Sequence, residues 1–222
     1  AKTGNLLHTV ALDALGTQNA YAVISGPSFA REVAADLPTA VVAASHDTAF
    51  AHDLIARFTT ARFRVYSSTD IIGVELGGIV KNVLAIATGI SDGMEFGANA
   101  RSALITRGLA EMMRLGIALG GQAETFMGLA GLGDLVLTCT DDQSRNRRYG
   151  LAIGSGKNLQ QAQHEIGQVV EGKRNAELII ALARKYQVEM PIVEAVWKIL
   201  SEQLTPQDAM AELLAREPKA EY

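Results

Sequence analysis

The chemically most informative residues are a lysine and an asparagine in the middle of an apolar helical stretch. Residues 70–90 are apolar on nearly every side of a helix, which is typical of a buried helix, yet Lys81 and Asn82 interrupt them. A buried ammonium group is costly, so Lys81 must be paired, neutral or in contact with a polar cavity. In such a cavity it could transfer a proton. The alternative is that Lys81 reaches the surface along its aliphatic stem.

A second cluster, DDQSRNRR, runs from Asp141 to Arg148. Ser144 is suited to cap a helix, which would place Arg145 and Asn146 in the first turn. A helix N-terminus attracts phosphate, and an arginine can bind phosphate through two parallel hydrogen bonds. The alternative is a solvated basic turn that the two aspartates balance. A nucleic-acid surface is disfavoured, because the chain carries a net charge of −4.

Three loops could bring backbone close to a ligand. GLAGLGD ends in Asp134, which could simply cap the following helix. SGPSFA, residues 25–30, follows an apolar strand, where α/β sheets carry ligand-binding loops, although it could be an ordinary turn. GQVVEG, residues 167–172, is a loop-to-helix junction. No Cys/His cluster has metal-ligand spacing, so we expect no metal site.

The elements that must position these residues divide the chain into two parts. The first, residues 1–69, combines helical stretches with short β-rich runs, and this order usually gives a parallel sheet. The helical stretches are 6–15 and 46–58, and the β-rich runs are 20–24, 39–44 and 63–66. Three short strands are few for an independent domain. We therefore expect the tail of a larger α/β domain whose first half is absent from this chain.

From residue 70 onward helices dominate, so residues 70–222 are expected to form an all-α part. Asp70 and Thr205 are suited to cap its first and last helices, and Pro206 to open the last. The other helices are expected at 98–119, 134–140, 144–153, 171–186 and 192–202. The chain has 222 residues, of which 48% are hydrophobic, enough for a sizeable core. A single cysteine and the lack of a long uncharged apolar run predict a reducing compartment and no membrane span.

Taken in order, these segments resemble the bacterial-type NAD(P)-dependent glycerol-3-phosphate dehydrogenases over almost the whole chain. The most specific match is GDLVLTCT followed by SRNRR; the others are ISGPSFA, VELGGIVKNVLAIATGISDG, GANARSALITRGLAEM and GQVVEG. For residues 1–69 the resemblance implies the C-terminal part of a Rossmann-like dinucleotide-binding domain. For residues 70–222 it implies an all-α substrate-binding and catalytic domain like those of 6-phosphogluconate dehydrogenase-type enzymes.

The same resemblance implies an oxidoreductase that interconverts dihydroxyacetone phosphate and sn-glycerol 3-phosphate by hydride transfer with NAD(P)H, feeding glycerophospholipid synthesis. The expected partner is a phosphorylated triose, the expected assembly a homodimer and the expected location the cytoplasm. Lys81 matches the catalytic lysine. The substrate-binding positions match Gly26, Ser28, Lys81, Asp134, Ser144, Arg145 and Asn146. The NAD or NADP contacts match Ala30, Arg145, Val169 and Glu171, and supporting polar groups match Asn82 and Thr138.

The chain departs from the family pattern at its beginning. It has no Gly-x-Gly-x-x-Gly turn, which holds the pyrophosphate of the dinucleotide. The position that separates NAD from NADP enzymes follows that turn, so the choice of coenzyme stays open. We expect the chain alone to be inactive, because the main cofactor site is missing. Two alternatives remain: a non-catalytic helical interaction module, and a related dehydrogenase of another hydroxy acid.

Overall fold

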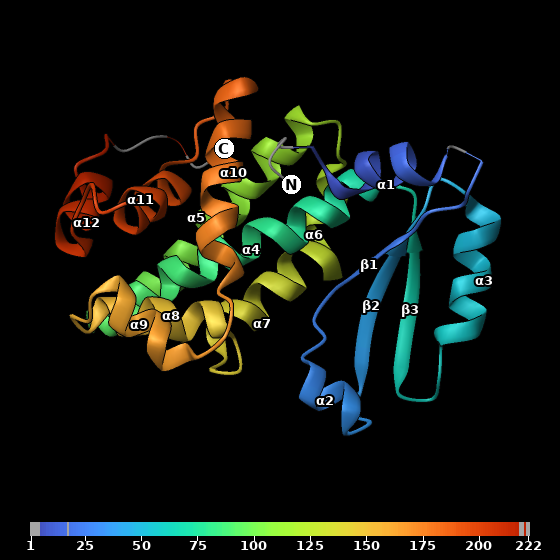
Figure 1. Cartoon of the computed structure of the whole chain (residues 1–222), viewed down its shortest axis with the longest axis horizontal. Helices are drawn as coiled ribbons and strands as arrows, with labels where there is room; N and C mark the ends of the chain where they lie inside the picture. The colour runs from blue at the N-terminus through green and yellow to red at the C-terminus, as the bar shows by residue number, and fades with distance from the viewer. Residues whose placement is uncertain (1–4, 17, 218–219, 221–222) are drawn as a thin grey trace.

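The computed structural model describes residues 5–16, 18–217 and 220, and the remaining residues of the two predicted domains lie outside it. A small sheet with its helices forms one side of the molecule, and a larger group of helices forms the other (Figure 1). This is the predicted α/β segment followed by an all-α segment. Helix α4, Ile71–Gly93, directly follows the last strand and passes through the middle of the helical part.

The sheet is mixed, which corrects the expectation of a parallel sheet. Its order is β1–β2–β3, with β1 antiparallel to β2 and β2 parallel to β3. The parallel pair is joined through α3, Thr48–Phe58, whose apolar side packs on the sheet. The short α2, Ala30–Ala34, joins β1 to β2 and has no buried residue, so it forms no comparable crossover. The strands are β1 Val23–Ser25, β2 Thr39–Ala44 and β3 Phe63–Ser68.

The antiparallel strand changes where the SGPSFA loop lies. Ser25, the last residue of β1, pairs with Val42, so the loop that follows runs toward the amino end of β2. It therefore does not share an edge with the carboxyl ends of β2 and β3, where the predicted parallel sheet would place it. Gly26 makes this path possible: its φ of 145° is in the region that favours glycine, and a Cβ there would lie 3.0 Å from the Cα of Val41.

The helical part follows the sequence prediction closely. Asp70 caps α4 by accepting a hydrogen bond from Gly73 N at 2.8 Å, and Thr205 caps α12, which begins at Pro206. The predicted helices are α1 Leu7–Leu15, α5 Gly97–Ala118, α7 Asp134–Thr140, α8 Arg145–Gly154, α10 Glu171–Lys185, α11 Pro191–Leu200 and α12 Pro206–Leu214. Further helices that the pattern did not indicate are α2, α6 Ala123–Met127, α9 Leu159–Ile166 and the π-helix η1 Leu129–Gly133.

Helices α4 and α8 touch backbone to backbone. Each contributes two glycines four residues apart, and a Cβ on any of the four would collide with the backbone of the other helix: Gly89 and Gly93 of α4, Gly150 and Gly154 of α8. Small residues at this spacing let two helix axes approach more closely than side chains normally allow. The position of α8 against α4 is therefore set by main-chain contact.

The sheet packs against the first turns of α4 and against η1. Ile71, Val74 and Ala130 form a small core with Ala44 of β2. A buried carboxylate, Glu75, adds polar contacts across the same boundary. It accepts hydrogen bonds from His8 N and Tyr21 Oη, at 2.8 and 3.3 Å, and its Oε2 lies 2.8 Å from His8 Nδ1. The first part of the chain is thus attached directly to the helix that carries Lys81.

Helix α4 is long and apolar enough to cross a membrane by length and composition. In the structure, however, 78% of its most apolar window is buried among the other helices. This burial is typical of a core helix, because such a helix passes the same test.

Candidate functional site

A polar cavity of about 320 Å³ brings together all the residues predicted to bind substrate. The loop after β1, the middle of α4, helix α7 and the amino ends of α8 and α10 line it. Its volume is within the range of small-ligand sites. Ten predicted residues line it: Gly26, Ser28, Lys81, Asn82, Asp134, Thr138, Ser144, Arg145, Asn146 and Glu171. Five that were not predicted also line it: Ser25, Phe29, Gly78, Leu137 and Gln143.

Lys81 forms an ion pair with Asp134 of α7. The lysine side chain is 20% exposed, and that of Asp134 is 3% exposed. Lys81 is therefore paired inside the cavity and does not extend along the surface. Asp134 is not the cap of α7, because its carboxylate turns toward Lys81. Burial raises the pKa of Asp134, while Lys81, Thr138 and the Gly26 N–H lower it by stabilising the charged form.

Two asparagine side chains in the cavity lining, Asn82 and Asn146, are hydrogen-bonded to each other. The Asn146 amide donates to Asn82 Oδ1 at 2.9 Å, and Asn146 Oδ1 accepts from Gly172 N at 2.9 Å. The amide nitrogen of Asn82 in turn donates to Gly78 O at 3.2 Å. These hydrogen bonds join α4, α8 and the start of α10. They fix Asn82 and Asn146 in one orientation beside Lys81.

The amino end of α8 faces the same cavity. Ser144 caps it as predicted, accepting a hydrogen bond from Arg147 N at 3.2 Å. Arg145 is 41% exposed, donates to Gln168 Oε1 at 3.2 Å and lies 3.9 Å from a Glu171 oxygen. The amino end of α8, Arg145 and Lys81 thus line one space, where Glu171 and Asp134 pair with the two cations. This arrangement suits an anion such as a phosphate monoester.

Two predicted cofactor residues lie outside the cavity. Ala30 is exposed at the start of α2, and Val169 is 74% exposed next to the lining residue Glu171. Gln168 and Glu171, on either side of the exposed Val169 in the sequence, both contact Arg145, so an apolar side chain and a cation are available to the ring and the phosphate of a dinucleotide. The residues present therefore fit the predicted group.

The SRNRR cluster serves two different purposes. Arg147 does not belong to a solvated turn. It is buried, pairs with Asp92 at 2.7 Å and with Asp142, and donates to Cys139 O at 3.2 Å. These contacts tie the end of α7, the end of α4 and the turn before α8 together. The three arginines look alike in sequence, and only spacing from the Ser144 cap could have separated Arg145 from Arg147.

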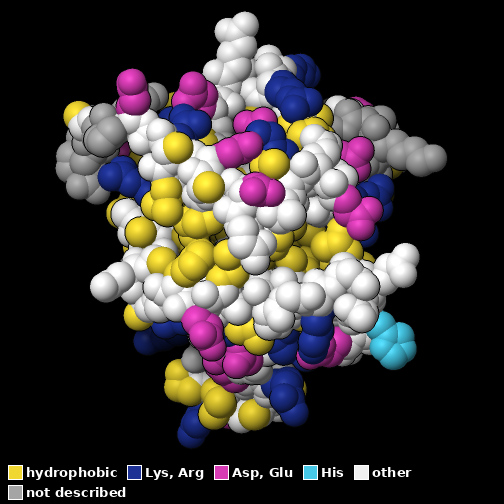
Figure 2. Space-filling model, turned by 90° about the vertical axis from the view of Figure 1, so that its left-hand side faces the viewer, with side chains coloured by type: hydrophobic (Ala, Val, Ile, Leu, Met, Phe, Trp, Pro, Cys, Tyr) yellow, Lys and Arg dark blue, Asp and Glu magenta, His cyan; other side chains and the backbone are white. Residues whose placement is uncertain are grey.

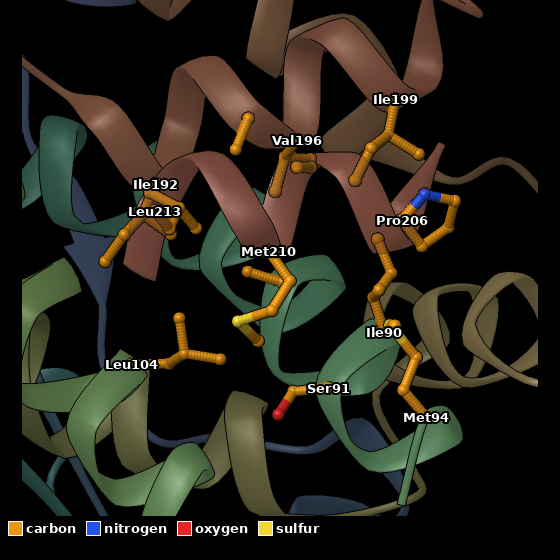
Figure 3. A pocket seen from close by; sticks show the side chains of 13 residues that line it. Ile90, Ser91, Met94, Leu104, Ile192, Val196, Ile199, Pro206, Met210 and Leu213 are labelled. Carbon is orange, nitrogen blue, oxygen red and sulfur yellow. The ribbon is translucent and has the colours of Figure 1, made fainter. Parts of the chain in front are cut away.

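A second, apolar cavity lies between α4, α5, α11 and α12 (Figure 3). Its volume is about 40 Å³, and its lining is apolar apart from Ser91. It is too small for a phosphorylated sugar and carries no charged group, so it is not the functional site. Within the described part of the chain, no three His, Cys, Asp or Glu side chains are placed to hold a metal ion.

Two family models match the chain. Residues 70–211 match the NAD-dependent glycerol-3-phosphate dehydrogenase C-terminus, and residues 1–51 match the N-terminus of the same family. A glycerol-3-phosphate dehydrogenase (NAD(P)+) of Photobacterium profundum is 59% identical over 99% of the chain. Its counterpart from Aliivibrio fischeri is 57% identical over 99% of the chain. The chain spans 65% and 64% of the lengths of these curated relatives.

Solved structures agree with these matches. The crystal structure of glycerol-3-phosphate dehydrogenase from Coxiella burnetii superposes with a TM-score of 0.94 at 60% identity, over 97% of this chain and 66% of that one. A Plasmodium falciparum glycerol-3-phosphate dehydrogenase, at 20% identity, has a TM-score of 0.88 over 99% of this chain and 64% of that one, and shares the fold. The chain belongs to the NAD-dependent glycerol-3-phosphate dehydrogenase family.

Proposed function

We propose that this protein interconverts dihydroxyacetone phosphate and sn-glycerol 3-phosphate with NAD(P)H. The observation that carries the proposal is the Lys81–Asp134 ion pair, which lies in one cavity with Arg145 and the amino end of α8. One part of this cavity can move a proton, and the other can hold a phosphate. A reaction on a phosphorylated ketone needs both. The names of the relatives that cover almost the whole chain support the same reaction.

In this proposal Lys81 is the proton donor. The coenzyme supplies the hydride that reaches the carbonyl carbon. The Lys81 ammonium gives its proton to the carbonyl oxygen, which becomes the new hydroxyl group, and in the reverse direction neutral Lys81 accepts that proton. Negative charge develops on this oxygen during the reaction, so a nearby cation also stabilises the transition state. Asp134 keeps the ammonium group in place, and Thr138 Oγ1 donates to Asp134 Oδ1 at 3.4 Å.

The remaining cavity residues are proposed to bind and orient the substrate. The phosphate is held by Arg145 and by Ser144 and Asn146 at the amino end of α8, where the helix dipole favours negative charge. Asn82 keeps Asn146 oriented, through the hydrogen bond described above. Gly26 and Ser28 form the opposite wall. Ala30, Arg145, Val169 and Glu171 are proposed to contact NAD or NADP at the cavity's edge.

We also propose that residues 1–69 belong to the dinucleotide-binding domain and residues 70–222 form the substrate domain. The matches to the two family models, which divide the chain between residues 51 and 70, support this division. A homodimer and a cytoplasmic location stay predictions. Figure 2 shows hydrophobic side chains gathered in a band on the face that holds α9, α11 and α12, which would suit a subunit interface. The mass of the complete gene product in solution, from light scattering, tests the dimer.

The test of the reaction is the oxidation of NADH and NADPH by the complete gene product in the presence of dihydroxyacetone phosphate. We expect Lys81→Ala to lower kcat by about 10²- to 10⁴-fold, the usual contribution of a general acid. The matched control is Lys157→Ala, which removes an exposed lysine that also pairs with a carboxylate, Glu165. A Lys81→Ala enzyme with kcat within a few-fold of wild type would refute the role. Preference for a non-phosphorylated hydroxy acid would refute the substrate.

A further inference from the structure

One wall of the cavity is attached to the rest of the molecule only lightly. Helix α2 follows the loop that provides Gly26, Ser28 and Phe29 to the cavity, and none of its five residues is buried. A segment with little buried apolar surface opens locally at low free energy. The position of this wall therefore depends on polar contacts at its ends. At the near end, the Gly26 N–H stabilises the Asp134 carboxylate.

In the described part of the chain, α2 itself is connected to the cavity lining by a side-chain hydrogen bond, and Asp36, just after α2, contacts Arg62. Gln143 Nε2 donates to Glu32 Oε1 at 2.8 Å, joining residues 111 positions apart. We call this hydrogen bond the clasp. Glu32 belongs to α2, and Gln143 lines the cavity immediately before Ser144. The clasp thus connects the helix that follows the loop at residues 26–29 with the turn before α8.

The Gln143 side of the clasp is rigid. Gln143 N donates to Asp141 Oδ1 at 2.7 Å, and Ser144 N donates to Asp141 O at 3.1 Å, which closes a tight turn before α8. The buried Arg147 fixes the same turn through Asp142. A fixed donor therefore holds a loosely attached helix, and the hydrogen bond sets how close α2 comes to the amino end of α8.

The carboxylate of Glu32 and the amide of Gln143 are also expected to affect the binding of an anionic substrate. Glu32 places a carboxylate at the edge of a cavity proposed to bind phosphate. An amide donor from Gln143 satisfies one oxygen of that carboxylate and keeps it turned toward the turn before α8. A glutamine that shields a carboxylate in this way acts on binding, because neither side chain lies at the reacting atoms.

We propose that Glu32 and Gln143 are positioning residues that set the affinity for the phosphorylated substrate by holding the loop at residues 26–29 closed over the cavity. The inference rests on the proposed function for its kinetic consequence. Its structural part, the restraint of residues 26–34 by the clasp, does not depend on any activity.

The structural part is tested by amide hydrogen exchange of the complete gene product without ligand. Gln143→Ala and Glu32→Ala should each raise the exchange rate of residues 26–34 by about ten-fold, as expected when a hydrogen bond to a charged group is lost. The double variant should exchange no faster than either single variant, because both break the same contact. Glu32→Gln keeps an acceptor oxygen but loses the charge, so its exchange rate should rise by less than in either alanine variant. Gln207→Ala, an exposed glutamine in α12, is the control and should change nothing.

The kinetic part is measured on the complete gene product. Gln143→Ala should raise the KM for dihydroxyacetone phosphate about three- to ten-fold and leave kcat within about two-fold, with an unchanged melting temperature. Unchanged exchange at residues 26–34 in both alanine variants would overturn the clasp, and a loss of kcat at constant KM would overturn its role in binding. A wild-type enzyme that does not oxidise NAD(P)H would refute the proposed function, while the exchange data would still decide on the clasp.

Discussion

The buried carboxylate of Glu111 should make the stability of this protein depend on pH. Glu111 belongs to α5, is 2% exposed and accepts hydrogen bonds from Ile192 N and Val193 N, at 2.8 and 3.2 Å. It thereby holds the amino end of α11. Burial raises its pKa from the ordinary 4.5 to about 7, although the two hydrogen bonds and the charges of Arg114 and Arg216 act in the opposite direction.

The direction and the size of the change in stability with pH follow from the raised pKa of Glu111. Between pH 4.5 and about 7 the folded protein keeps a proton on Glu111 that the unfolded chain has lost. The free energy of unfolding therefore falls as the pH rises through this interval, and it is constant with respect to Glu111 on either side. Each pKa unit corresponds to about 1.4 kcal/mol, so the loss from this one group is about 3 kcal/mol.

Urea unfolding of the chain, followed by circular dichroism between about pH 4.5 and 8, measures this loss. The comparison is with Glu111→Gln, which has a similar shape and cannot titrate, so the free energy of wild type should fall by about 3 kcal/mol relative to the variant. Glu177→Gln, at an exposed position of α10, should follow wild type. If wild type and Glu111→Gln show parallel pH profiles, the carboxyl group is not desolvated as the structure indicates.

Three further predictions concern stability and reactivity. Gly89→Ala should lower the free energy of unfolding in urea by about 1–3 kcal/mol, because a Cβ would push α8 away from α4. The control is Gly128→Ala, where a Cβ would lie 3.4 Å from the nearest atom, and its free energy of unfolding should stay within about 0.5 kcal/mol of wild type. Burial raises the pKa of Cys139 to about 12, so the thiol should not react with a disulfide reagent at neutral pH until urea unfolds the chain; rapid reaction in native buffer would contradict this. Arg147→Ala should destabilise the chain by about 1–3 kcal/mol, because Asp92 loses a partner although it keeps Arg101, whereas the exposed pair of Arg57 with Asp53 should be removable without measurable effect.

The parts of the structure that depend on neighbouring residues were predictable. Ser144 accepts from Arg147 N and Asp70 from Gly73 N, both three residues away, so the cap and the helix start could be located from residue types alone. The apolar pattern of residues 70–90 likewise predicted a buried α4. In each case the interacting residues lie within one turn of one helix, where their spacing in the sequence determines their distance in space.

Contacts between distant elements were not predictable in this way. Lys81 and Asp134 are 53 positions apart, and Asp134 alone looked like a helix cap. Its true orientation depends on η1, a π-helical turn that replaces the expected N-cap geometry. The direction of β1 also escaped the pattern, because an apolar run has the same composition in a parallel and an antiparallel strand. The family resemblance grouped the site residues into one site, which their spacing in the sequence alone could not do.

Charged residues in the core were the other omission. The sequence pattern assigned no role to Glu75 or Glu111, yet each is buried and accepts hydrogen bonds from backbone N–H groups of another element. A glutamate on the apolar α4 was visible beside Lys81, but its partners His8 and Tyr21 lie more than fifty positions away. Without a structure, nothing distinguishes such a residue from a solvated one.

The glycine contact between α4 and α8 bears on the length of the substrate. The proposed proton donor belongs to α4, and the proposed phosphate site lies at the amino end of α8. The main-chain contact between these helices therefore fixes the distance between their backbones. The contact fixes the two helix backbones relative to each other, whereas the Lys81 and Arg145 side chains can still change rotamer. We therefore expect a ketose phosphate with one more carbon between its carbonyl group and its phosphate to have a lower kcat/KM than dihydroxyacetone phosphate, because the helix backbones cannot move apart to fit it.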